Sequence, residues 1–309
     1  MSFCAAVAGR YFKETIPEIF THFSTFYAIL VSYDITLGCS NRMKRFIGLL
    51  MALTIAAATS AVSAAELPAI HSETYVVMDA ASGQVLLERG AHNRMYPASI
   101  TKILTSALAL EHLQETGGSL DDKHTMTYEA THSIDRGSTH IALTEEEVVT
   151  VRDLLYTTMI ESANDSANGL AEYTAGTLEA FPELMNRKAA ELGMTGTSFA
   201  NPNGLDQEGH YSTARDMARL AACAVKNETL VRLCSTRSVT VGGRTMTNHN
   251  RLLRSIDGCI GLKTGYTRAA GRTLVSCVRR NGRTLVAVTL QDGNDWADHA
   301  ALYEFGFGP

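Results

Sequence analysis

The chain is organised around one segment, Tyr96-Pro97-Ala98-Ser99-Ile100-Thr101-Lys102, which an apolar run at residues 103–110 follows. Pro97 fixes its own φ and is excluded from a helix interior, so it predicts the approach to a helix whose first turn holds Ser99 and Lys102. Side chains three positions apart share one face of a helix, where a hydroxyl and an amine can exchange a proton. The segment therefore indicates an activated serine nucleophile.

An isolated S-x-x-K pattern is weak, because serine, threonine and lysine near a helix start are ordinary capping and surface residues. Two later segments strengthen it. Ser162-Ala163-Asn164 combines a second hydroxyl with an amide, and Lys263-Thr264-Gly265 combines a cation with a hydroxyl and a glycine. S-x-x-K and K-T-G each occur once in the chain. The three segments predict one site assembled from distant parts of the sequence.

Longer stretches surround these motifs. They are Pro97-Ala98-Ser99-Ile100-Thr101-Lys102, Glu161-Ser162-Ala163-Asn164-Asp165, Asn201-Pro202-Asn203-Gly204-Leu205-Asp206, Asn250-Arg251-Leu252-Leu253 and Gly261-Leu262-Lys263-Thr264-Gly265-Tyr266-Thr267. The motif set resembles the penicillin-recognising serine enzymes. The longer stretches resemble, more narrowly, the D-alanyl-D-alanine carboxypeptidase family of low-molecular-weight penicillin-binding proteins, and the resemblance covers about residues 73–308.

The resemblance implies a serine-type D-Ala-D-Ala carboxypeptidase of the beta-lactamase/transpeptidase-like superfamily. Such an enzyme removes the terminal D-alanine from peptidoglycan stem peptides through an acyl-enzyme, here on Ser99, and beta-lactam antibiotics inhibit it covalently. No metal or organic cofactor is implied, and the 10 histidines show no close metal-binding pattern. The net charge of −5 gives no reason to expect nucleic acid as a partner.

The chemistry of peptide hydrolysis assigns roles to these residues. A serine needs a base that removes its proton during attack, and we assign Ser99 as the nucleophile. Lys102 can be that base only when neutral, and an amine that is partly desolvated beside another cation, here Lys263, has a depressed pKa. Ser162 is expected to relay a proton to the leaving amine, and the Asn164 amide to hold a substrate peptide group.

The K-T-G segment suits recognition of the substrate's end. Lys263 and Thr264 offer a charge and a hydroxyl donor to a terminal carboxylate. Gly265 is expected to let the substrate backbone approach this edge strand closely. The resemblance implies an oxyanion hole made by the backbone N–H groups of Ser99 and Tyr266.

The chain departs from the family pattern at two places. Relatives often carry histidine where this chain has Tyr266, which leaves the backbone role intact. Some also place an arginine near the carboxylate after the following hairpin, but residues 292–296 offer none. We therefore expect carboxylate binding to rest on Lys263 and Thr264.

Several alternatives stay open. Ser166-Ala167-Asn168 repeats the S-x-N pattern one helical turn on, and we interpret it as helix packing or capping. A beta-lactamase would need a water-activating glutamate between the second and third motifs. Glu183-Leu184-Met185-Asn186 comes early after Ser162 with a different spacing, so we interpret it as packing and solvent-facing residues. A penicillin-binding sensor that is acylated without turnover is the non-enzymatic alternative.

The beginning of the chain predicts export. Met43-Lys44-Arg45, an apolar run at residues 46–58 and Val62-Ser63-Ala64 together describe a signal peptide at residues 43–64. The apolar run is shorter than the roughly 20 residues of a membrane span. Residues 1–42 fit neither a signal nor the domain, and we interpret them as an extension from a mis-assigned start. Residues 65–309 are then the catalytic domain, for which we expect no stable membrane anchor.

The composition agrees with one large exported domain. Apolar residues make up 45% of the chain, as in soluble globular proteins. The cysteines of the domain are Cys223, Cys234, Cys259 and Cys277. They show neither C-x-x-C nor metal-ligand spacing, so we expect buried free thiols.

The apolar periodicity predicts an α+β fold. Strand-like runs at residues 74–79 and 84–88 precede a helical middle, and strands at residues 239–241, 272–278 and 284–290 precede a closing helix at 296–305. Asn281-Gly282 is a strong hairpin signal. We therefore expect one antiparallel sheet built from both ends of the domain, with flanking helices and a helical lobe. The resemblance implies the same architecture, with the site in the cleft between.

The helical middle shows two further patterns. Thr144-Glu145-Glu146-Glu147 predicts a helix start with an acidic first turn. The helical spacing of Leu154, Leu155 and Met159 leads into Ser162, and we interpret these three residues as core.

Overall fold

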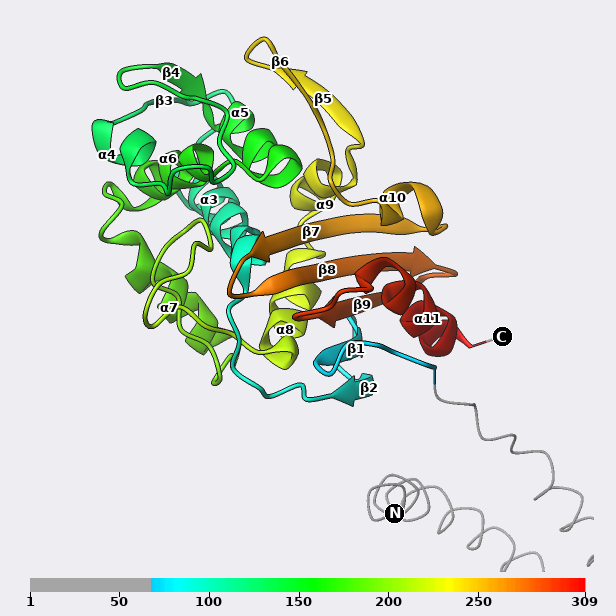
Figure 1. Ribbon diagram of the computed structural model, residues 1–309. Coiled ribbons are helices and arrows are strands. Elements are labelled where there is room, and N and C mark those ends of the chain that lie inside the picture. Colours follow the sequence, from blue (N-terminus) through cyan, green and yellow to red (C-terminus); the bar gives the residue numbers. More distant parts are fainter. Residues whose placement is uncertain (1–67, 309) are drawn as a thin grey trace, which may run out of the picture. The chain divides into compact units, whose positions relative to one another are not determined.

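The computed structural model describes residues 68–308, so the signal peptide predicted at residues 43–64 and the extension at 1–42 lie outside the described residues (Figure 1). The main sheet has the strand order β2-β1-β9-β8-β7, and every neighbouring pair is antiparallel. Its strands are β1 (Tyr75–Asp79), β2 (Val85–Arg89), β7 (Cys259–Thr267), β8 (Gly271–Arg280) and β9 (Arg283–Thr289). Both ends of the domain therefore build one sheet, which confirms the predicted α+β class.

The hairpin between β8 and β9 forms where the sequence predicted it. Arg280 pairs with Arg283, and the two residues between them, Asn281 and Gly282, have φ angles of 51° and 75°. Asparagine and glycine tolerate this left-handed conformation, which matches the twist of the flanking strands.

Alternate residues of the strands face two different cores. Leu285 and Ala287 of β9 pack with Leu302 and Tyr303 of α11 (Asp295–Phe307). Their neighbours, such as Val286, pack in the larger core on the opposite face. Figure 1 shows α11 on one face of the sheet, with α8 (Ala214–Ala224) behind the other. Helices therefore cover both faces.

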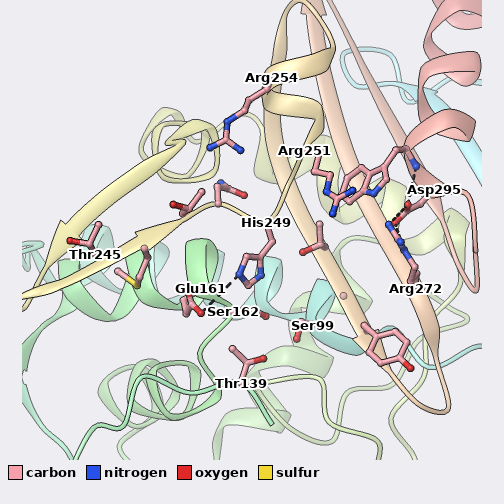
Figure 2. Close-up of a pocket in the computed structure, with 17 residues that line it drawn as sticks. Ser99, Thr139, Glu161, Ser162, Thr245, His249, Arg251, Arg254, Arg272 and Asp295 are labelled. Carbon is pink, nitrogen blue, oxygen red and sulfur yellow. Dashed lines mark hydrogen bonds and ion pairs between the residues drawn. The ribbon is translucent and has the colours of Figure 1, made fainter. Parts of the chain in front are cut away.

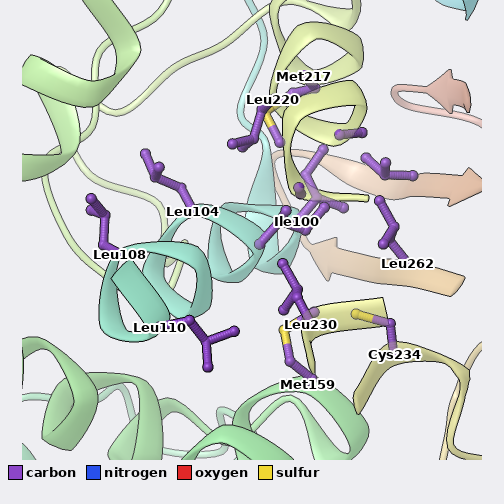
Figure 3. Packing of buried hydrophobic residues seen from close by; sticks show 14 of the residues in the cluster. Ile100, Leu104, Leu108, Leu110, Met159, Met217, Leu220, Leu230, Cys234 and Leu262 are labelled. Atoms are coloured by element: carbon purple, nitrogen blue, oxygen red, sulfur yellow. The ribbon is translucent and has the colours of Figure 1, made fainter. Parts of the chain in front are cut away.

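The helical lobe packs around α3 (Lys102–Thr116), whose Leu104 and Leu108 are buried with Leu220 of α8 and with Leu230 of α9 (Glu228–Ser235) (Figure 3). The remaining elements are η1 (Ala98–Thr101), β3 (Lys123–Thr125), α4 (Tyr128–His132), β4 (Val148–Thr150), α5 (Val151–Tyr156), η2 (Thr157–Glu161), α6 (Asn164–Ala175), α7 (Phe181–Glu191), β5 (Ser238–Val241), β6 (Arg244–Thr247) and α10 (Leu252–Ser255). Leu154, Leu155 and Met159 are buried in the core, as predicted.

The prediction that a helix begins at Thr144 is wrong. Residues 144–147 form a turn, in which the Thr144 N–H donates to the Glu147 carboxylate at 3.1 Å. The β-branched residues that follow form β4, which pairs with β3. The helix begins only at Val151, where Thr150 and Asp153 form a reciprocal capping box. The capping signal six residues later, not the acidic run, marks the helix start.

Two further expectations concern the described range. Cys223, Cys234, Cys259 and Cys277 are free thiols, as predicted, but only Cys234 and Cys277 are fully buried. Within residues 68–308, no helix has the length and apolar character needed to cross a bilayer.

Candidate active site

Ser99 lies in a tightly packed turn. It belongs to the 3-10 helix η1, which continues directly into α3. The preceding Ala98 has a φ of 53°, a backbone conformation that residues other than glycine rarely adopt. A Cβ on Gly204 would overlap the Ala98 carbonyl, and one on Gly265 would lie 2.9 Å from the Ser99 nitrogen. Glycine at 265 is thus required by the Ser99 turn itself, a reason that the sequence interpretation did not give.

The Lys102 amine is buried and has three hydrogen-bond partners. Its Nζ lies 3.0 Å from Ser99 Oγ and 2.6 Å from Asn164 Oδ1, and it also donates to the backbone carbonyl of Asn203. Burial and, secondly, the charge of Lys263 lower the pKa of Lys102 well below its usual value. A neutral amine has two N–H groups and one lone pair. The two carbonyl oxygens can take the N–H groups, which leaves the lone pair for the Ser99 hydroxyl proton.

Ser162 and Asn164 come from the junction of η2 and α6. Ser162 has a φ of 71° and lines the same cavity as Ser99 (Figure 2). Asn164 is buried, and because its Oδ1 accepts from Lys102, only its Nδ2 can donate to a substrate. The structure therefore brings together the first two predicted motifs.

The K-T-G segment lies on β7, the edge strand, as expected. Thr264, Gly265 and Tyr266 line the cavity, and Tyr266 is 68% exposed. Lys263 is only 2% exposed, and its Nζ donates to the Thr264 carbonyl at 2.8 Å. Burial lowers the pKa of Lys263 to about 8. Lys263 is thus positioned to act on the buried Lys102 by its charge.

The cavity has a volume of about 760 Å³ and is mostly polar (Figure 2). Its walls are Ser99, Thr139, Glu161, Ser162, Thr245, Met246, Thr247, Asn248, His249, Arg251, Arg254, Thr264, Gly265, Tyr266, Arg272, Asp295 and Trp296. Sequence reasoning gave no role to the three arginines among these residues.

Sequence reasoning also missed Asn203. Its carbonyl accepts from Lys102, while its Nδ2 donates to Asn168 Oδ1 at 3.0 Å. Asn168 and Ser166 are fully buried, and the Ser166 hydroxyl accepts from Thr157 at 2.8 Å. The second S-x-N pattern therefore serves helix packing, as predicted. In the sequence, only its place in the stretch N-P-N-G-L-D at residues 201–206, which shares the family resemblance, pointed to Asn203.

Glu183 lies away from the cavity. It is on the surface of α7, where its carboxylate pairs with Arg187 at 3.4 Å, while Met185 is buried in the core. The interpretation of this segment as packing and solvent-facing residues is confirmed.

The family model and the curated relatives that match this chain all carry the same description. The family model for D-alanyl-D-alanine carboxypeptidase matches residues 60–294. D-alanyl-D-alanine carboxypeptidase DacF of Bacillus subtilis is 34% identical over 71% of this chain and 57% of its own length. DacC of Escherichia coli is 36% identical over 73% and 58%. The chain thus spans under three fifths of these two relatives, but 82% of DacB2 of Mycobacterium tuberculosis, at 32% identity over 76% of this chain.

Solved structures share the fold. Penicillin-binding protein 6B of Escherichia coli superposes with a TM-score of 0.73 and 30% identity, covering 80% of this chain and 79% of that one. The Streptomyces K15 DD-transpeptidase gives 0.72 and 29%, covering 78% and 98%. Penicillin-binding protein D2 of Listeria monocytogenes, in a cefotaxime-bound form, gives 0.71 and 30%, with the same coverage.

Proposed function

The chain belongs to the D-alanyl-D-alanine carboxypeptidase family, and on this premise we propose that it removes the terminal D-alanine from peptidoglycan stem peptides ending in D-Ala-D-Ala. The observation that carries the proposal is the environment of Lys102, whose Nζ contacts two carbonyl oxygens and the Ser99 hydroxyl. This environment supplies a neutral base to a serine without a histidine.

In the proposed acylation, Lys102 takes the Ser99 proton as Oγ attacks the carbonyl carbon of the penultimate D-alanine. The backbone N–H groups of Ser99 and Tyr266 would stabilise the oxyanion. The bond to the terminal D-alanine then breaks, and Ser162 relays the proton to the leaving amine. The product of this step is an ester on Ser99.

In deacylation, a water molecule attacks the ester, and Lys102 accepts the water's proton before returning it to Ser99. Asn164 Nδ2 would hold a substrate peptide carbonyl, because its oxygen is engaged by Lys102. The strand edge at Thr264 would align the substrate beside Ser99. Beta-lactam antibiotics would acylate the same serine, in line with the cefotaxime-bound structure of the Listeria relative.

We also propose export to the extracytoplasmic space, where peptidoglycan is located, directed by the signal peptide at residues 43–64. Residues 65–309 would then form the catalytic domain. The test of this part is the N-terminal sequence of the protein recovered from cells, which should begin near residue 65.

The activity is tested by three assays on the purified secreted form. Release of D-alanine from an N-acylated Lys-D-Ala-D-Ala peptide supports a carboxypeptidase. Rapid hydrolysis of a chromogenic cephalosporin would indicate a beta-lactamase, and stable penicillin labelling alone would indicate a sensor. Ser99→Ala should abolish all three signals, and any D-alanine release that survives it would refute the assignment of the nucleophile.

A further inference from the structure

We propose that His210 is a positioning residue for the base Lys102, because it holds the loop at residues 199–210 against the start of α3. The inference rests on the proposed function and extends it. The Asn203 carbonyl accepts a hydrogen bond from Lys102, yet the two residues lie 101 positions apart in the sequence. The placement of this loop therefore decides whether Lys102 keeps its partner.

The loop at residues 199–210 closes at its base. Ser198 and Tyr211 exchange two backbone hydrogen bonds of 2.9 Å, one in each direction. Within the loop, the Asn201 side-chain oxygen accepts from the Gly204 N–H at 2.8 Å. The loop is thus a preformed unit, and its contacts with α3 decide where it lies.

The imidazole of His210 joins both ends of the loop to the nucleophile's helix. Its Nδ1 accepts from the Ala200 N–H at 3.0 Å, and its Nε2 lies 3.0 Å from Thr101 Oγ1. An N–H can donate only to an unprotonated ring nitrogen, so the proton of the neutral ring is on Nε2 and is donated to Thr101. Burial and, secondly, the charge of Lys102 lower the pKa of His210 to about 4, so the ring is neutral at pH 7.

Two other hydrogen bonds hold the middle of the loop. Thr105 Oγ1 donates to the Pro202 carbonyl at 2.6 Å, and Asn203 Nδ2 donates to Asn168 Oδ1 at 3.0 Å. They leave the ends of the loop to His210. Since Thr101 directly precedes Lys102, the histidine acts on the backbone that carries the base.

The ring also excludes water from the base. His210 is 1% exposed and packs edge-on against Phe199, with 5.7 Å between the ring centroids. Its removal would leave the buried Thr101 hydroxyl without this partner, and a polar gap of side-chain size can admit water. The charge of Lys102 acts on the pKa of His210, so this gap would lie close to the amine.

Water beside Lys102 should change its titration. Burial is the first cause of its low pKa, so hydration should raise the pKa toward the ordinary lysine value. Lys102 must be neutral to accept the Ser99 proton, and the acylation rate therefore rises with pH through this pKa. A higher pKa moves this acid limb of the pH profile to higher pH. The charged groups that act on Lys102 are Lys263 and Asp165, and both stay in place in the variants below.

The experiment measures the rate of Ser99 labelling by a fluorescent penicillin across the acid and neutral pH range. His210→Leu should raise the midpoint of the acid limb by about one pH unit, which lowers the rate on that limb about tenfold. His210→Gln should restore the wild-type profile, because an amide can accept from Ala200 and donate to Thr101. Thr101→Val removes the partner of Nε2 and should shift the midpoint in the same direction, so it decides the question where His210→Leu does not fold.

His299→Leu is the matched control. His299 is also a fully buried histidine with two side-chain partners, Ser276 and Thr289, but it joins α11 to β8 and β9. Its replacement should lower the Tm without moving the acid limb. A wild-type acid limb in His210→Leu and Thr101→Val overturns the proposal, and so does an equal shift in His299→Leu or a His210→Gln profile like that of His210→Leu.

The readout also separates this inference from the proposed function, because penicillin labelling requires no peptide turnover. If the wild type is labelled but releases no D-alanine, the carboxypeptidase assignment fails, while the position of the acid limb still tests His210.

Discussion

Replacing Gly265 with alanine should displace the Ser99 turn. A Cβ at this position would overlap the Thr273 hydroxyl and lie 2.9 Å from the Ser99 nitrogen, closer than ordinary carbon contacts allow. Neither neighbour is the free end of a flexible side chain, because the Thr273 hydroxyl also donates to the Pro97 carbonyl at 2.9 Å. Over-packing of this kind costs about 1–3 kcal/mol, which corresponds to a decrease in Tm of about 2–12 °C for a domain of this size.

The effect on acylation should exceed the effect on stability, since small displacements of a reacting group can cost about 100-fold in rate. The assay is the second-order rate of labelling by a fluorescent penicillin, measured well below the Tm. Gly293→Ala is the matched control, because its φ is unstrained and no atom lies within 4 Å of the added Cβ. Wild-type labelling by the Gly265→Ala protein would refute the reasoning that the glycine is required by the nucleophile's turn.

Two further predictions use the same assays. Lys263 has a pKa of about 8, so its charge is present below this pH and lost above it. The acylation rate of the wild type should therefore fall as the pH rises through 8, and this fall should be absent in Lys263→Met. An identical decline in both proteins would contradict a role for this charge. Thr150→Ala removes the N-terminal cap of α5, so it should lower the free energy of unfolding by about 1 kcal/mol without changing the acylation rate. A Tm equal to that of the wild type would show that the cap is dispensable.

The catalytic segments could be recognised from the sequence because their chemistry is local. Ser99 and Lys102 lie three residues apart in the sequence, and in the structure Lys102 Nζ is 3.0 Å from Ser99 Oγ. The sheet was predictable for a similar reason, since the strand-like runs near the start of the domain, the period-two patterns near its end and the Asn-Gly turn are local signals. The error at Thr144 arose because an acidic first turn was given more weight than the β-branched residues after it.

The rest of the site depends on long-range contacts that leave no periodic signal. The Asn203 carbonyl meets Lys102 across 101 positions of the sequence. Arg251 is exposed, and nothing in the sequence shows that Trp296 lies beneath its guanidinium. The sequence also could not show that Arg272 is neutralised by Asp295. Only the folded structure shows which cationic side chains of the cavity are paired with a carboxylate and which are not.

The central claim is that Lys102 is a neutral amine beside Ser99, and its side-chain titration tests this most directly. Protein labelled with ¹³C and ¹⁵N at lysine can be titrated by NMR, with the Lys102 signal assigned through Lys102→Met and the Lys263 signal through Lys263→Met. The account predicts that the Lys102 resonance is that of a neutral amine at pH 7. A Lys102 signal that titrates near the ordinary lysine value of about 10.4 would contradict it.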